Sequence, residues 1–289
     1  MDRKKIILYP NIENDDCFKM TCQVGDILHN NGWQTVLCPA FVGENEEITP
    51  LSGYVFSELE NELSTAEMII TLGGDGTILR AARTAADAGV PILGINLGGK
   101  GFMAELEADD IGRLSNVAAG EYKIDTRVMI DVEVVRNEEV INCDFALNDV
   151  VVKGDNKVID MTIFGDNQKI THFSGDGVVV ATPTGSTAYS MSAGGPIVDP
   201  AAKNIIITPI CAHILEARSF VLVQERIVTV EIGYKKSNPS YISVDGGDHI
   251  NIQSGDTVKV YKSKRNTKLV RLSDKSFYRK VSEKLGERV

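Results

Sequence analysis

The stretch Met68-Ile69-Ile70-Thr71-Leu72-Gly73-Gly74-Asp75-Gly76-Thr77 decides the fold of the first part of the chain. Its apolar first half predicts a buried strand, and the residues after it predict the first turns of a helix. A glycine-rich turn at this junction offers backbone N–H groups to a phosphate. Asp75 is unexpected there, because a carboxylate repels phosphate. It suits a group that takes a proton from an attacking hydroxyl or holds a metal ion. A tight turn with Asp75 as helix N-cap is the structural alternative.

The segments around this stretch alternate between strand and helix patterns. Apolar runs predict strands, and segments with one apolar face predict helices. The predicted strands are 5–10, 33–38, 67–72 and 90–96, and the predicted helices are 17–30, 58–63, 77–88 and 109–119. A Pro-, Gly- and Glu-rich stretch at 39–57 predicts a surface loop. Such alternation is typical of an α/β domain with a mostly parallel sheet, in which ligands bind beyond the carboxyl ends of the strands.

The pattern changes near residue 122. Arg127–Val134 alternates apolar and polar residues, as a strand with one buried face does, and many further short strand-like runs follow, separated by turn signals such as Asp245-Gly246-Gly247. This spacing predicts an all-β, sandwich-like second domain. We therefore expect an α/β domain over 1–122, a β-sandwich-like domain over 123–274, and a polar tail at 275–289 that forms a short helix.

Composition excludes several classes of protein. The chain has 289 residues and a net charge of −10, which argues against nucleic acid or an anionic membrane as the main partner. No apolar stretch is long enough to span a bilayer, and the first residues are too short and abrupt for a signal peptide. The five cysteines are scattered without a C-x-x-C pair, which predicts reduced thiols in a cytoplasmic protein and no zinc site.

A second candidate site lies within the predicted β domain, in the segment 174–196. There a buried strand opens onto a turn dense in hydroxyl groups and glycines, including Thr182-Pro183-Thr184-Gly185-Ser186-Thr187-Ala188-Tyr189-Ser190. Short donors and acceptors together with one aromatic ring suit a ribose and a base. A Ser/Thr-rich turn that caps a helix is the alternative. Combined with the first motif, the segment favours a nucleotide site.

Taken together, these stretches resemble the NAD kinase family, the enzymes that phosphorylate NAD to NADP. The matching segments are GGDGT at 73–77, GIN-x-G-x-x-GF at 94–102, LND at 147–149, GDG-x(4)-TPTGSTAYS-x-SAGGP at 175–196, and TPI-x(2)-H-x(4)-R at 208–218. GGDGT alone is shared with diacylglycerol and sphingosine kinases and with phosphofructokinases, whereas the 175–196 block is far more specific. The family fold is an α/β domain followed by a β-sandwich domain.

The resemblance implies a role for each matching residue of the first domain. Asp75 matches the carboxylate that accepts the proton of the adenosine ribose 2′-hydroxyl. Gly74, Gly76 and Thr77 match backbone and hydroxyl contacts near the phosphates. Phe102 matches an apolar wall beside the bound NAD.

In the second domain, the resemblance implies further contacts with NAD. Asn148 and Asp149 match a pair that hydrogen-bonds the adenine and a ribose, and Asp176 matches a carboxylate near the nicotinamide end. The implied wall on the adenine side consists of Thr187, Ala188, Tyr189 and Ser192. Two segments depart from the family pattern: Asp149 stands where Glu is usual, and 211–219 lacks a usual proline.

The resemblance further implies ATP with Mg²⁺, or polyphosphate, as phosphoryl donor, and a homodimer or homotetramer. The spacing of the four histidines gives no signal of metal ligands supplied by the chain. Two alternatives remain open. One is a diverged lipid or small-alcohol kinase that shares the GGDGT loop. The other is a non-catalytic NAD(P)-binding protein that has kept the pocket.

Overall fold

The computed structural model describes residues 4–12, 15–40, 51–98, 101–214, 217–233, 238–273 and 277–286. The chain forms two compact units, one of Met1–Thr126 with Thr267–Val289 and one of Arg127–Asn266. The predicted second domain ends at residue 274, whereas the chain already returns to the first unit at Thr267. The first unit is therefore built from both ends of the sequence.

A parallel sheet forms the centre of the first unit, with the order β2-β1-β3-β4. Its strands are β1 (Lys5–Pro10), β2 (Gln34–Leu37), β3 (Met68–Gly73) and β4 (Ile92–Asn96). Next to β4 lie the short parallel strand β5 (Leu106–Glu107) and the end of β17 (Thr257–Arg271), where Leu269 pairs with Ile92. The expected α/β architecture with a mostly parallel sheet is confirmed.

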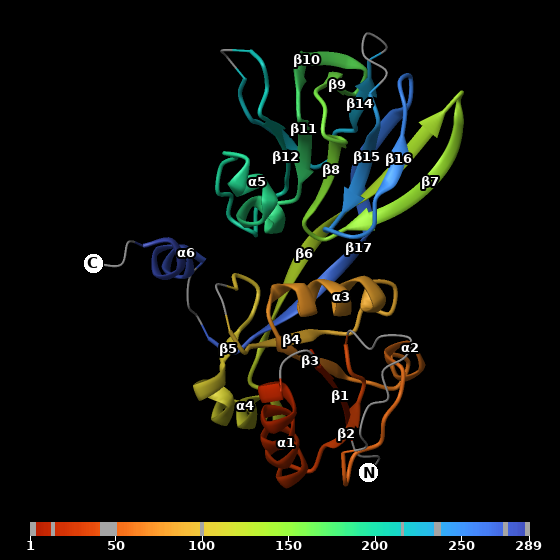
Figure 1. The fold of residues 1–289 in the computed structure, drawn as a ribbon. Helices are drawn as coiled ribbons and strands as arrows, with labels where there is room; N and C mark the ends of the chain where they lie inside the picture. Colours follow the sequence, from red (N-terminus) through yellow and green to blue (C-terminus); the bar gives the residue numbers. More distant parts are fainter. Residues whose placement is uncertain are drawn as a thin grey trace. The chain divides into compact units, whose positions relative to one another are not determined.

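Helices cover both faces of this sheet (Figure 1). They are α1 (Asp15–Asn30), α2 (Leu59–Glu62), α3 (Asp75–Ala85), the 3₁₀ turn η1 (Ala108–Arg113) and α4 (Leu114–Ala118). The last helix, α6 (Phe277–Leu285), follows β17, and its Lys280 donates a hydrogen bond to the carbonyl of Ala104. Val24 and Leu28 of α1 pack with Ile70 and Leu93 in one core, whereas Ile78 of α3 lies against Gly94 on the opposite face.

Most of the predicted elements in this unit occur within a few residues of their expected ends. The predicted helix over 109–119 differs, because it is split between η1 and α4. Gly112 falls in this segment, and glycine weakens an α-helix by its backbone entropy. Of the predicted loop at 39–57, residues 41–50 lie outside the described residues.

Two sheets form the second unit. One is antiparallel with the order β13-β12-β11-β8-β15-β16. Its strands are β8 (Asp149–Gly154), β11 (Gly177–Ala181), β12 (Asn204–Ile210), β13 (Phe220–Val223), β15 (Ser240–Val244) and β16 (Ile250–Ile252). The other contains β9 (Ile159–Gly165), β10 (Gln168–Gly175) and β14 (Val228–Ile232), together with β17, β6 (Lys123–Arg136) and β7 (Glu139–Ala146).

The inner faces of these two sheets share one apolar core. Val150 and Val152 of β8 point into it beside Ile242 and Val244 of β15, and Met161 of β9 meets them from the other sheet. The expected β-sandwich-like architecture is thus confirmed. In β8 and β15 the intervening residues face outward, because side chains alternate along a strand. Among the described residues, no helix is both long and apolar enough to cross a membrane.

Candidate functional site

The GGDGT loop of the first unit holds Asp75 at the first position of α3. The half-buried Asp75 carboxylate accepts hydrogen bonds from the backbone N–H groups of Phe102, at 2.8 Å, and Met103, at 3.1 Å. A carboxylate has about four lone-pair sites, so two remain for another donor. The loop therefore presents an oriented proton acceptor at the N-terminus of an 11-residue helix.

Glycines make room for this arrangement. A Cβ on Gly73 would lie 2.3 Å from Oγ1 of the buried Thr77, and one on Gly101 would lie 2.8 Å from the Asp75 carboxylate. Nothing lies within 4 Å of the Cβ positions of Gly74 and Gly76. The backbone at these two residues is thus open to the close approach of an anion.

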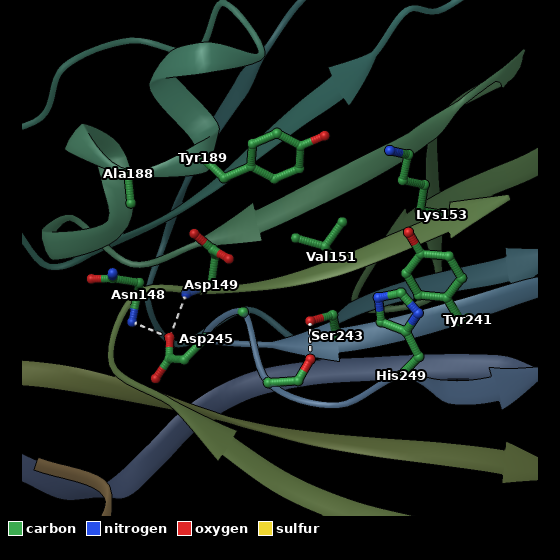
Figure 2. Close-up of a pocket in the computed structure, with 12 residues that line it drawn as sticks. Asn148, Asp149, Val151, Lys153, Ala188, Tyr189, Tyr241, Ser243, Asp245 and His249 are labelled. Atoms are coloured by element: carbon green, nitrogen blue, oxygen red, sulfur yellow. Dashed lines mark hydrogen bonds between the residues drawn. The ribbon is translucent and has the colours of Figure 1, made fainter. Parts of the chain in front are cut away.

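A pocket of about 430 Å³ opens on the outer face of the six-stranded sheet of the second unit (Figure 2). It is floored by outward-facing residues of β8 and β15 and by the turn after β15, and Ala188 and Tyr189 border it. The complete lining is Asn148, Asp149, Val151, Lys153, Ala188, Tyr189, Tyr241, Ser243, Asp245, Gly246, Gly247 and His249.

Asp245 holds one end of the pocket in place. Its carboxylate accepts hydrogen bonds from three consecutive backbone N–H groups, those of Leu147, Asn148 and Asp149, at 2.8, 2.7 and 3.1 Å. The hydroxyl of Ser243 donates to the carbonyl of Gly247 at 2.8 Å, which closes the turn. The charge of Asp245 is therefore balanced by the N–H groups that lead into β8.

Asp149 behaves differently, although it lies beside Asp245. It is 4% exposed, and burial together with the neighbouring Asp245 charge raises the pKa of Asp149 from 3.8 to about 7. Among the described residues, no donor lies within hydrogen-bond distance of its side-chain oxygens. Figure 2 shows this carboxyl group directed into the pocket toward Tyr189. A ligand that donates a hydrogen bond would satisfy it.

The hydroxyl-rich segment borders the pocket through close backbone packing. The Thr182 hydroxyl donates to the Leu147 carbonyl at 2.6 Å and accepts the N–H of Gly185 at 3.1 Å. A Cβ on Gly185 would lie 2.1 Å from the carbonyl oxygen of Asn148, so only glycine fits there. This packing places Tyr189, at the start of α5 (Tyr189–Ser192), at the pocket with 38% of its surface exposed.

The pocket brings together four of the predicted site residues, Asn148, Asp149, Ala188 and Tyr189. Three others of the second unit do not line it: the half-buried Asp176 in the turn between β10 and β11, the half-buried Thr187, and the exposed Ser192. The predicted residues of the first unit, Gly74, Asp75, Gly76, Thr77 and Phe102, form the loop described above.

The β15 side of the pocket was not predicted from the sequence. Asp245-Gly246-Gly247 was interpreted only as a turn, and His249 was not assigned to a site. Lys153, Tyr241 and Ser243 carried no motif. Alternation with buried valine and isoleucine showed that these residues point outward, but the pairing of β8 with β15 joins segments about 90 residues apart, which no local pattern reveals.

The described residues contain no group of three or more His, Cys, Asp or Glu side chains arranged to hold a metal ion.

Comparison with known proteins matches each half of the chain to a family model. Residues 26–122 match the model of the ATP-NAD kinase N-terminal domain, and residues 147–272 match that of the ATP-NAD kinase C-terminal domain. The NAD kinase of Natranaerobius thermophilus is 39% identical over 287 residues, which are 98% of this chain and 98% of that protein.

Solved structures agree in fold. The yeast NADH kinase complexed with NADH superposes with a TM-score of 0.86 at 24% identity, covering 99% of this chain and 88% of that one. An NAD kinase from Archaeoglobus fulgidus in complex with ATP gives a TM-score of 0.71 at 24% identity, covering 98% of each chain. On these matches to both domains and across nearly the whole sequence, the chain belongs to the NAD kinase family, whose enzymes phosphorylate NAD.

Proposed function

We propose that the protein transfers the terminal phosphoryl group of ATP, or of polyphosphate, to the 2′-hydroxyl of the adenosine ribose of NAD. Asp75 is the general base in this proposal. The observation that carries it is the geometry of the Asp75 carboxylate, which two backbone N–H groups orient while leaving lone pairs available. A ribose hydroxyl is a weak nucleophile, so a positioned acceptor for its proton accelerates attack on phosphorus.

The phosphoryl donor is proposed to bind at the GGDGT loop. Open backbone at Gly74 and Gly76 lets N–H groups approach an anion, and the N-terminus of α3 favours negative charge. Phe102, whose N–H contacts Asp75, is proposed as an apolar neighbour of the dinucleotide. Mg²⁺ enters with ATP as part of the substrate, where it neutralises charge on the transferring phosphoryl group.

The outer-face pocket is proposed to hold part of NAD. Asp149 is suited to accept a hydrogen bond from a sugar hydroxyl, because no donor in the described part of the chain reaches its buried carboxyl group. Asn148 supplies amide edges for adenine, and the exposed ring of Tyr189 is available to stack. The proposed adenine-side and nicotinamide-side contacts of Thr187, Ser192 and Asp176 rest on the family resemblance alone, since these residues do not line the pocket.

The protein is further proposed to act in the cytoplasm as a homodimer or homotetramer, without a membrane or nucleic acid partner. The net charge of −10 and the four free cysteines among the described residues support this setting. The oligomer rests on the family resemblance, and size-exclusion chromatography with light scattering would test it.

An NADP-formation assay tests the reaction. Purified protein is incubated with NAD and either ATP or polyphosphate, with and without Mg²⁺. We expect NADP from the wild type, and a loss of turnover of about 10²- to 10⁴-fold for Asp75→Asn. NAD affinity, measured by calorimetry, should change less than about threefold for this variant, since the side chain keeps its size.

The matched control is Asp109→Asn, an exposed carboxylate outside the loop, which should keep full turnover. Near-normal turnover in Asp75→Asn would remove Asp75 from the role of base. Thermal stabilisation of the wild type by NAD without NADP formation from either donor would instead favour a non-catalytic binding protein.

A further inference from the structure

The outward-facing residues of β8 are, in order along the strand, an acidic, an apolar and a basic side chain. Asp149, Val151 and Lys153 all line the pocket, while Val150 and Val152 between them point into the core. Residues two apart on one face of a strand are separated by about 7 Å, so Asp149 and Lys153 lie about 14 Å apart along the strand. That spacing leaves room for a ring between the two charged groups.

Lys153 is a cation without an ion-pair partner among the described residues, in an acidic protein. The chain has 40 Asp and Glu residues against 30 Lys and Arg, yet among the described residues no carboxylate lies within 4.0 Å of the Lys153 ammonium. The side chain is half-buried. Figure 2 shows its amino group and the hydroxyl of Tyr189 directed toward each other from the two sides of the pocket.

An aromatic stack supports Lys153 from the neighbouring strand. Tyr241 of β15 is its direct partner in the antiparallel register, so the two side chains lie side by side on the outer face. The ring of Tyr241 stacks on His249, with centroids 3.8 Å apart and planes 16° from parallel. Tyr241 and His249 both line the pocket, so the stack lies beside the lysine on the same face of the sheet.

The two ends of the pocket therefore differ in charge. At one end, Asp245 is balanced by three N–H groups, and Asp149 offers an acceptor without a donor. At the other end, Lys153 offers a cation that no carboxylate of the described part of the chain pairs. A ligand that matches both ends has hydrogen-bond donors on one side of a ring and negative charge on the other, which describes a sugar joined to a phosphate.

We propose that Lys153, supported by the Tyr241–His249 stack, is a specificity-determining residue that binds the pyrophosphate of the dinucleotide. The inference rests on the proposed function for the identity of the dinucleotide. It adds that the second unit recognises the phosphate linkage through Lys153, apart from the sugar and base contacts of Asp149 and Tyr189.

Equilibrium binding tests this inference without turnover. Calorimetry would compare NAD with the two nucleosides that it contains without phosphate, adenosine and nicotinamide riboside. For Lys153→Gln we expect NAD affinity to fall about tenfold, since one charge-assisted hydrogen bond is lost. Affinity for either nucleoside should stay within about twofold. Lys153→Arg keeps the charge and should retain NAD affinity within about threefold.

Salt dependence gives a second measurement on the same proteins. NAD binding by the wild type should weaken as the salt concentration rises from 50 mM to 300 mM. For Lys153→Gln, NAD affinity should fall less steeply with salt concentration. The matched control is Lys169→Gln, an exposed lysine of β10 outside the pocket, which should change neither affinity nor slope.

Two results would overturn the role of Lys153. One is an equal loss of NAD and nucleoside affinity in Lys153→Gln, and the other is unchanged NAD affinity and slope in that variant. The proposed function fails separately: absence of NADP formation by the wild type, together with the expected effect of Lys153→Gln on NAD binding, would contradict the kinase reaction and leave the pyrophosphate contact supported.

Discussion

The carboxylate of Asp245 accepts the backbone N–H of Asn148 at 2.7 Å, which ties the turn after β15 to the start of β8. Leu147 and Asp149 donate to the same side chain. Asp245→Ala would leave three N–H groups without their acceptor, so we expect the free energy of unfolding to fall by about 2 kcal/mol or more. Urea denaturation measures this change, and NAD affinity should fall with it.

A nearby carboxylate provides the control for that variant. Asp248 is exposed three residues further on, and Asp248→Ala should change stability by less than about 0.5 kcal/mol. Equal stability of Asp245→Ala and Asp248→Ala would show that the three hydrogen bonds contribute nothing to the folded state.

Gly101 controls the position of the Asp75 carboxylate. A Cβ at this residue would lie 2.8 Å from Asp75 Oδ1, so Gly101→Ala should displace the carboxylate and lower kcat by about tenfold or more. The cost in stability should stay near 1 kcal/mol. Steady-state kinetics and thermal unfolding measure the two effects. Gly112→Ala, where nothing lies within 4 Å of the new Cβ, should leave kcat unchanged, and an equally active Gly101→Ala would contradict the steric role.

The raised pKa of Asp149 predicts a pH-dependent stability. Its folded-state pKa is about 7 against an ordinary value of 3.8, so the folded protein keeps a proton that the unfolded chain releases between these values. Stability contributed by the neutral carboxyl group is therefore complete below pH 4 and is lost as the pH rises through about 7. Asp149→Asn removes this dependence. The free energy of unfolding of the variant should therefore rise, relative to that of the wild type, by about 2 kcal/mol as the pH increases from 5 to 8.

Denaturant unfolding at pH 5 and at pH 8 measures the difference in the free energy of unfolding between Asp149→Asn and the wild type. Asp248→Asn, at an exposed carboxylate, should show the same small offset at pH 5 and pH 8. If the offset of Asp149→Asn is also constant, the carboxyl group does not change protonation in this range.

Glu105 binds the segment from Arg271 to Lys280 within the first unit. Its side chain is 1% exposed and accepts the N–H groups of Leu272 and Ser273 at 3.1 and 3.0 Å, while Arg271 and Lys280 approach it as ion pairs. Glu105→Gln turns an amide toward these cations and should cost about 3 kcal/mol. Hydrogen exchange should speed up in β17 beyond Thr267 and in α6. Glu121→Gln, at an exposed carboxylate, should leave exchange there unchanged, and slow exchange in both variants would contradict the role of Glu105.

Local patterns predicted most of the fold. The run before Gly73 and the apolar face after Thr77 give β3 and α3, because period and glycine position are local properties. Asp149 was named as a site residue only through the family resemblance, whereas Tyr189 was also indicated by the hydroxyl-rich turn that contains it. Local patterns could not give Lys153 or Tyr241, because their contact depends on the pairing of β8 with β15. Nor could they predict the raised pKa of Asp149, which depends on burial and on Asp245.

The return of the chain to the first unit at Thr267 has a consequence for biosynthesis. The strand segment that contains Leu269, next to β4, is synthesised after all the residues of Arg127–Asn266. The β-rich unit is thus available to fold on the nascent chain first, and the unit that carries Asp75 reaches its final form only after the β-rich unit has been made.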